Sequence, residues 1–148
     1  MTELVFVIAV IGILSAIAIP KFAGVRDDAT ISKAKSTLAS VRSAIATERQ
    51  KRILKGDFTP ITDLAKINGA DQMIFDAFDG NTSNPVLEYA PRACKNASQR
   101  GCWISSADNT YIYRMPITGD VTFTLANKHL TCDPNNASTG KYCKRLSE

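Results

Sequence analysis

An uncharged, strongly apolar run over residues 4–19 begins the chain and constrains its fold more than any other feature. Glu3 stands immediately before the run, Gly12 lies inside it and Pro20 follows it. As an α-helix the run reaches only about 24 Å, whereas the hydrocarbon core of a bilayer is roughly 30 Å thick. A carboxylate at the end of such a helix is costly in lipid unless a cation neutralises it. The run therefore suits a segment that waits in a membrane and then packs against copies of itself better than a permanent anchor.

Two other interpretations of the run compete with this one. A secretory signal peptide would have basic residues before the apolar stretch and a small-residue cleavage site after it. Here Met1, Thr2 and Glu3 include no Lys or Arg, and no Ala-x-Ala pattern follows the run, so we do not expect a signal peptide. A simple membrane anchor stays open as an alternative, because periodicity alone does not exclude it.

The helical pattern continues beyond the apolar run. Apolar residues spaced three and four apart place one stripe on a helix: Ile31, Ala34, Leu38, Val41 and Ile45. No proline occurs between Phe22 and Phe58, and Gly56 suits a C-cap. The sequence therefore predicts one long helix from about Thr2 to about Leu54, apolar all round at first and amphipathic afterwards. We expect the stripe to pack on a C-terminal domain; a coiled-coil partner is the weaker alternative, because the heptads are few.

The second half of the chain has the composition of a loop-rich α+β domain, since most of the glycines and prolines of the whole chain follow residue 56. Four segments are rich in strand-forming residues: 86–89, 102–105, 110–115 and 121–126. A glycine-containing turn over 117–120 predicts that the last two form a hairpin. Short helical turns are predicted over 63–67 and 72–78. Three or four strands with one apolar face would cover the stripe on the long helix.

All four cysteines lie in the second half, at Cys94, Cys102, Cys132 and Cys143. Their spacing is not that of a zinc knuckle and the single histidine is His129, so we expect no metal site. Four cysteines allow three disulfide connectivities. We predict Cys94–Cys102 and Cys132–Cys143, because each bridge closes a short polar loop and does not require distant parts of the chain to be aligned. Persistent bridges imply an oxidising compartment, whereas four reduced and buried thiols fit these polar loops poorly.

No catalytic constellation is visible in the sequence. His129 stands without a nucleophile motif, and there is neither a glycine-rich phosphate loop nor a pair of metal-binding carboxylates. We therefore expect no enzymatic activity and no cofactor. Three Asn-x-Ser motifs, which begin at Asn81, Asn96 and Asn136, match the N-glycosylation pattern, and we interpret them only as markers of exposed loops.

The start of the chain closely resembles the type IV pilin family. The resemblance rests on Thr2-Glu3-Leu4, the apolar run, its continuation Gly-Ile-Leu-Ser-Ala-Ile-Ala-Ile-Pro over residues 12–20, and Lys21. It covers about the first 45 residues, and the motif is shared by pilins, type II secretion pseudopilins and competence pseudopilins. Family precursors carry a basic leader that is cut before a Phe, which is then N-methylated. Neither the leader nor that Phe precedes Glu3 here, so the methylated amine cannot be assigned to Met1.

The resemblance implies a pilin-like α+β fold in which the long helix packs on a small antiparallel β-meander. An apolar segment for the membrane and the filament core is expected over residues 1–22, and a globular domain over 23–148. Within that domain the resemblance implies an amphipathic helix over 23–55, a loop region over 56–85, and the sheet with both disulfide loops over 86–148.

The function implied by the resemblance is that of a structural subunit of a type IV pilus, most like a type IVa major pilin. The subunit would wait in the bacterial inner membrane, be extracted by the pilus assembly machinery and join identical copies in an extracellular filament. Glu3 would pair with the N-terminal amine of a neighbouring subunit, and the helix between Gly12 and Pro20 would bend or unwind. Such filaments serve adhesion, motility or DNA uptake, so surfaces and DNA are candidate partners.

The second cysteine pair resembles the disulfide-bounded surface loop of many pilins. Four of its polar residues are expected on the outer surface: Asp133, Asn135, Asn136 and Lys141. One alternative function is that of a type II secretion or competence pseudopilin, and another is that of a monomeric membrane-anchored binding protein. Major secretion pseudopilins typically have a Tyr-Pro pair after the long helix and a calcium loop with acidic ligands near the C-terminus. Here Phe58-Thr59-Pro60 follows the helix and the cysteine-bounded end is basic, which favours a pilin.

Overall fold

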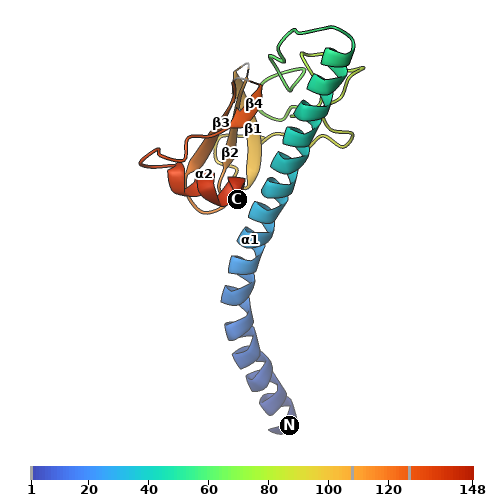
Figure 1. Ribbon diagram of the computed structural model, residues 1–148. Coiled ribbons are helices and arrows are strands. Elements are labelled where there is room, and N and C mark those ends of the chain that lie inside the picture. Colours follow the sequence, from blue (N-terminus) through green and yellow to red (C-terminus); the bar gives the residue numbers. More distant parts are fainter. Residues whose placement is uncertain (1, 108, 127) are drawn as a thin grey trace.

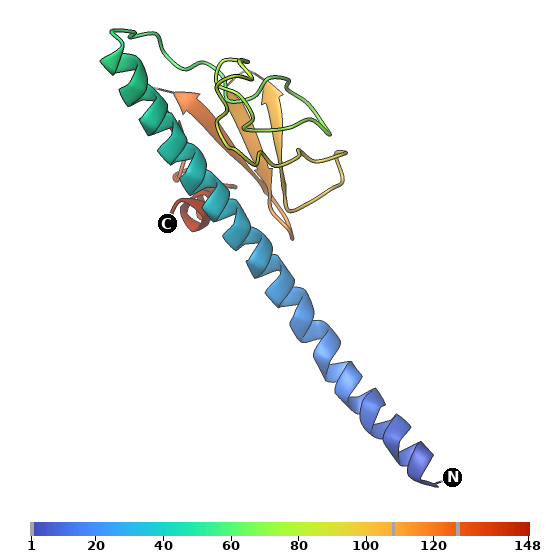
Figure 2. The ribbon, with the colours of Figure 1, turned by 90° about the vertical axis from the view of Figure 1, so that its right-hand side faces the viewer.

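The computed structural model describes residues 2–107, 109–126 and 128–148, and within residues 19–23 it describes the backbone alone. Its elements follow in the order α1 (Thr2–Leu54), β1 (Cys102–Ala107), β2 (Thr110–Arg114), β3 (Asp120–Ala126), β4 (His129–Thr131) and α2 (Gly140–Ser147). One half of α1 lies along the sheet and loops, while the N-terminal half projects away from them (Figures 1 and 2). The predicted α+β class with a long N-terminal helix is thus confirmed.

The long helix has the bounds that its residue pattern predicts. All five residues of the apolar stripe are buried: Ile31, Ala34, Leu38, Val41 and Ile45. The helix stops where Gly56 takes a positive φ of 75°, which a residue with a side chain adopts only under strain. Gly56 N then donates to Ile53 O at 2.9 Å and Asp57 N donates to Arg52 O at 2.9 Å, so the last carbonyl groups of α1 are satisfied.

The sheet is an antiparallel meander with the strand order β1-β2-β3-β4. Alternate side chains of β2 and β3 point into the core, as the period of two predicts: Tyr111, Tyr113, Val121, Phe123 and Leu125. Trp103 of β1 packs among them, with its ring centroid 4.9 Å from that of Tyr113 and 5.4 Å from that of Phe123. These residues and the stripe of α1 belong to one hydrophobic core, which joins the sheet to the helix.

Three elements predicted between the helix and the sheet are wrong. Residues 63–67 and 72–78 are not helical, and residues 86–89 do not form a strand. The segment instead buries Leu64, Ile74 and Phe75 at irregular intervals, which no regular helix or strand would place on one face. Its backbone N–H and C=O groups are satisfied by scattered hydrogen bonds, such as the one from Leu87 N to Phe75 O at 3.2 Å, and not by the regular ladder of a sheet.

Two elements near the C-terminus were not predicted. The short strand β4 begins at His129 and pairs with β3. The helix α2 turns Cys143 and Leu146 into the core. It starts at Gly140, where a Cβ atom would lie 2.4 Å from the carbonyl oxygen of Pro134, so only glycine fits without moving the backbone.

Candidate assembly surfaces

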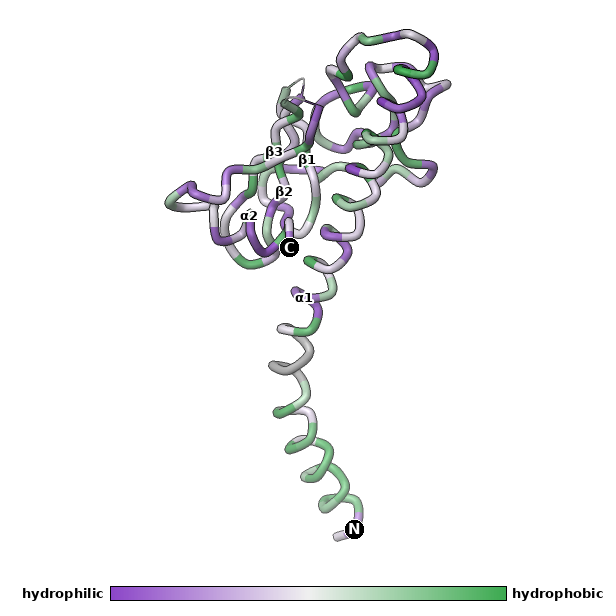
Figure 3. The backbone as a smooth tube through the Cα atoms, viewed as in Figure 1, coloured by the Kyte–Doolittle hydropathy of each residue, from purple (hydrophilic) through white to green (hydrophobic). Residues whose placement is uncertain are grey.

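The N-terminal arm of α1, which we define as residues 2–18, has no cover from the rest of the chain. Its ten large apolar side chains are between 39% and 71% exposed: Leu4, Val5, Phe6, Val7, Ile8, Val10, Ile11, Ile13, Leu14 and Ile17. Figure 3 shows that this apolar character persists along the projecting part of the helix. Because the exposed side chains surround the helix, no single groove would cover them.

The three predicted assembly residues all lie on this part of α1. Glu3 is exposed in the first helical turn, where the helix dipole favours a negative charge. Gly12 is exposed, and a Cβ atom there would meet nothing within 4 Å. The side chain of Pro20 lies outside the described residues. The backbone is helical from Gly12 to Pro20, so a change of this stretch in a filament stays a prediction.

Within the described residues, no helix combines the length and the apolar character needed to cross a membrane.

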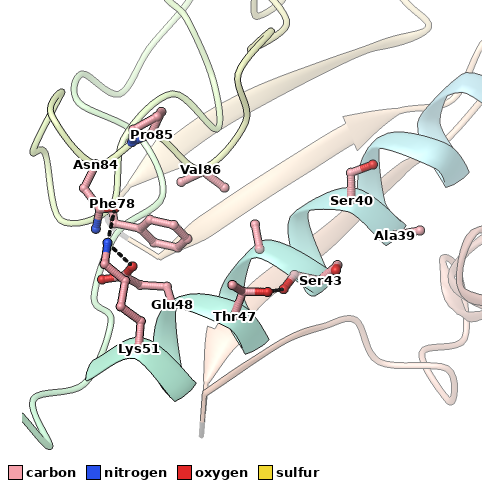
Figure 4. Close-up of a pocket in the computed structure, with 11 residues that line it drawn as sticks. Ala39, Ser40, Ser43, Thr47, Glu48, Lys51, Phe78, Asn84, Pro85 and Val86 are labelled. Carbon is pink, nitrogen blue, oxygen red and sulfur yellow. Dashed lines mark hydrogen bonds and ion pairs between the residues drawn. The ribbon is translucent and has the colours of Figure 1, made fainter. Parts of the chain in front are cut away.

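A groove of about 670 Å³ opens between the exposed side of α1 and the loop over residues 78–86. Figure 4 shows the wall formed by α1, which carries mostly small side chains, and the opposite wall formed by Phe78, Asn84, Pro85 and Val86. The helix wall is lined by Ala39, Ser40, Ser43, Ala44 and Thr47. Small side chains let a second helix approach α1 closely, so this face suits helix packing.

An ionic cluster at one end of the groove fastens the loop to α1. The buried carboxylate of Glu48 accepts from Arg52 Nε at 3.0 Å and from Lys51 Nζ at 3.3 Å. Arg52 Nη2 also donates to Asp79 Oδ2 at 2.6 Å. The other oxygen of Asp79 accepts from the backbone N–H of Thr62 at 2.6 Å, so one arginine links the helix to two parts of the loop region.

The electrostatics of this cluster favour its charged form. Burial alone would raise the carboxyl pKa of Glu48, but hydrogen bonds with Arg52, Asn84 and Lys51 outweigh burial and lower it. Burial likewise opposes ionisation of Asp79, and bonds from Thr62 and Arg52 again lower its pKa. Desolvation would lower the pKa of Arg52, but the two carboxylates raise it.

Acid should therefore destabilise the domain through Glu48 and Asp79. Both pKa values are lower in the folded chain than in the unfolded chain, where they lie near 4. The stabilisation is thus fully present above about pH 5 and is lost as the pH falls through the folded values. Replacing Arg52 with Gln should cost about 1–3 kcal/mol at pH 7 and flatten the acid dependence of the unfolding free energy. Denaturant unfolding from pH 3 to 7 tests this, and equal pH slopes for variant and parent would contradict it.

Both disulfides have the predicted pairing. Cys94–Cys102 and Cys132–Cys143 have Cα–Cα distances of 5.4 Å and 5.9 Å. Residues 133, 135, 136 and 141 are exposed as expected. Lys141, however, belongs to the first turn of α2 and not to the loop, because the helix starts before the second cysteine.

The Asn-x-Ser motifs in the two disulfide loops form the same turn. The side-chain oxygen of Asn136 accepts from Ser138 N at 3.0 Å and from Ser138 Oγ at 3.0 Å. Asn96 accepts from Ser98 N at 3.2 Å and from Ser98 Oγ at 2.8 Å. Each motif therefore has a conformational role, since it closes an Asx turn inside a bridged loop.

The described residues contain no group of three or more His, Cys, Asp or Glu side chains arranged to hold a metal ion. His129 is exposed at the start of β4. No protein-family model, curated protein or solved structure matches this chain.

Proposed function

We propose that this chain is the structural subunit of a type IV pilus filament, in which the arms of many copies pack together as the core. The all-round exposure of the arm carries this proposal. A helix with apolar side chains on every side needs cover on every side, and one partner helix covers only a single stripe. Neighbouring arms in a bundle provide the missing cover without another protein.

The energy of this packing is large enough to drive assembly. Burial of a large aliphatic or aromatic side chain stabilises by about 1.5–3 kcal/mol. The arm exposes ten such side chains, so the gross gain is on the order of 10 kcal/mol or more per subunit before the costs of association. The globular domain would then lie outside the core, with the loop of the Cys132–Cys143 bridge on the outer surface.

The resemblance of the first 45 or so residues to type IV pilins supports the same conclusion. By that resemblance the subunit is held in the bacterial inner membrane before assembly, and the assembly machinery moves it into the filament. The apolar arm suits both environments, because lipid and neighbouring helices each remove it from water. The filament is proposed to be extracellular, which agrees with two disulfides in one small domain.

Electron microscopy of sheared surface filaments, with mass spectrometry of their subunit, tests the proposal directly. Filaments composed of this chain are expected. If the purified surface filaments consistently lack it, or if the full chain stays monomeric in lipid, the function of an anchored monomer would replace that of a filament subunit.

Replacement of Glu3 with Leu should keep the chain membrane-associated and lower filament yield more than a hundredfold. The reason is that a cation of the neighbouring subunit, the proposed partner of Glu3, would be left buried and unpaired, at a cost of about 3–5 kcal/mol. Yield is measured as sedimentable subunit after shearing. Glu3→Gln should behave like Glu3→Leu if the charge matters, and normal filaments from both variants would remove Glu3 from the assembly mechanism.

A further inference from the structure

Charge is distributed unevenly between the loop region and the C-terminal end of the globular domain. The loop region over residues 57–90 contains a single lysine, Lys66, against six acidic residues: Asp57, Asp63, Asp71, Asp76, Asp79 and Glu88. The opposite charge gathers where α2 meets α1. Four basic residues and one acidic residue line an open depression of about 560 Å³ there: Lys35, Lys141, Lys144, Arg145 and Glu148. We call the segment over residues 57–90 the acidic loop and the lining of the depression the basic platform.

Several of these charges form no ion pair with the residues that the structure describes. Lys35, Lys141 and Lys144 form no ion pair with any described residue. On the acidic loop, the same holds for the exposed Glu88 and the half-exposed Asp76. Both surfaces can therefore still gain an opposite charge.

The basic platform is held rigidly. The Cys132–Cys143 bridge ties α2 to the end of β4, and Arg145 Nη2 donates to Asp28 Oδ1 on α1 at 2.8 Å. Arg42 of α1 also donates to Ser147 Oγ at 3.4 Å. The amines of Lys35, Lys141 and Lys144 are thus presented by two helices whose relative position is fixed.

The two surfaces lie at different levels along α1. The acidic loop is fastened near the end of the helix, since Asp79 and Asn84 bond to Arg52 and Lys51. The platform lies at the level of Lys35, sixteen residues or about 24 Å earlier along α1. Figures 1 and 2 agree with this placement, because α2 lies toward the arm and the green to yellow-green loops lie toward the other end of the domain.

We propose that the basic platform of one copy binds the acidic loop of the next copy along the filament. This inference rests on the proposed filament and adds the contact that sets the axial offset of neighbouring subunits. An offset of about 24 Å brings the two surfaces to the same level. The same offset lays residues 2–18 of one copy beside residues 18–34 of the neighbouring α1. Apolar packing of arms is non-directional, whereas paired charges fix a register.

Other anionic partners fit the platform less well than a second copy. Its lining residues include no aromatic side chain on which a nucleic-acid base could stack. Lys35 also lies about 24 Å along α1 beyond the apolar run, more than twice the roughly 8–10 Å Debye length, so lipid headgroups at the end of that run would be screened.

Carbodiimide cross-linking of the full-length chain tests the contact, because this reagent joins an amine to a carboxylate only where they touch. Equal amounts of unlabelled and ¹⁵N-labelled chain are assembled together, cross-linked and digested. Mixed-isotope peptides that join Lys35, Lys141 or Lys144 to Asp76 or Glu88 are expected. Filaments that yield no mixed-isotope cross-linked peptides would overturn the contact but leave the filament function standing. Mixed-isotope peptides from a chain that forms no filaments would support the contact and overturn the filament function.

Charge reversal gives an independent readout. Lys144→Glu and Glu88→Lys should each lower filament yield by roughly five- to tenfold, because a repulsive contact replaces an attractive one. The double variant should recover most of the yield. Lys95→Glu changes an exposed lysine that belongs to neither surface, so it serves as the charge-matched control and should assemble normally. Equal yields for the parent and both single variants, or a preference of the platform for DNA that abolishes the protein cross-links, would contradict the proposal.

Discussion

Replacing Ile11 with aspartate is expected to abolish filament formation while the globular domain stays folded. Ile11 is 57% exposed on the arm, far from the core, so the single chain loses no packing. In the proposed filament the new carboxylate would be buried among apolar neighbours, which costs several kcal/mol in every subunit. Electron microscopy and sedimentation measure assembly, and near-ultraviolet circular dichroism with thermal melting measures the domain.

Ile117→Asp is the matched control for this variant. Ile117 is 70% exposed between β2 and β3, where no subunit contact is proposed. The control should assemble like the parent, because the same chemical change then meets water. Normal filaments from Ile11→Asp would show that the arm does not lie in a filament core that excludes water. An unfolded globular domain in that variant would show that the arm supports the fold of the single chain.

Replacing Cys132 with Ser should lower the free energy of unfolding by about 2–5 kcal/mol. The bridge closes the loop between β4 and α2 and positions the buried Leu146, so its loss loosens both. The same change should reduce the amount of assembled protein, because α2 carries the basic platform. Denaturant unfolding under non-reducing conditions gives the stability, and sedimentable filament gives the yield.

Cys143→Ser and the double variant separate the bridge from the individual side chains. If the bridge is responsible, each single variant and the double variant should lose similar stability, since all three lack the same bond. An unchanged unfolding midpoint in Cys132→Ser would contradict the prediction. Normal assembly of a destabilised variant would show that the bridge stabilises the domain without ordering the contact surface.

The helix, its buried stripe and the disulfide pairing could be predicted from the sequence because they depend on near neighbours. A 3–4 spacing puts Leu38 and Val41 on one face whatever lies opposite. The turn at Gly56 ends the helix through bonds only a few residues long. Each pair of cysteines is separated by 8 or 11 residues, so local loop closure was sufficient to choose partners. The exposed apolar arm follows from the composition of residues 4–19.

The loop region, α2 and both charged surfaces depended on contacts between distant parts of the chain. Arg52 meets Asp79 across 27 residues, which no local pattern specifies. Lys35 joins Lys141 and Lys144 only because α2 docks on α1 through Leu146 and the bond of Arg145 to Asp28. The sequence by itself determined the long helix, the strands β1 to β3 and the two bridges, since local sterics and spacing set these. Tertiary structure alone decided which charges share a surface, because burial of the core fixes where the irregular segments lie.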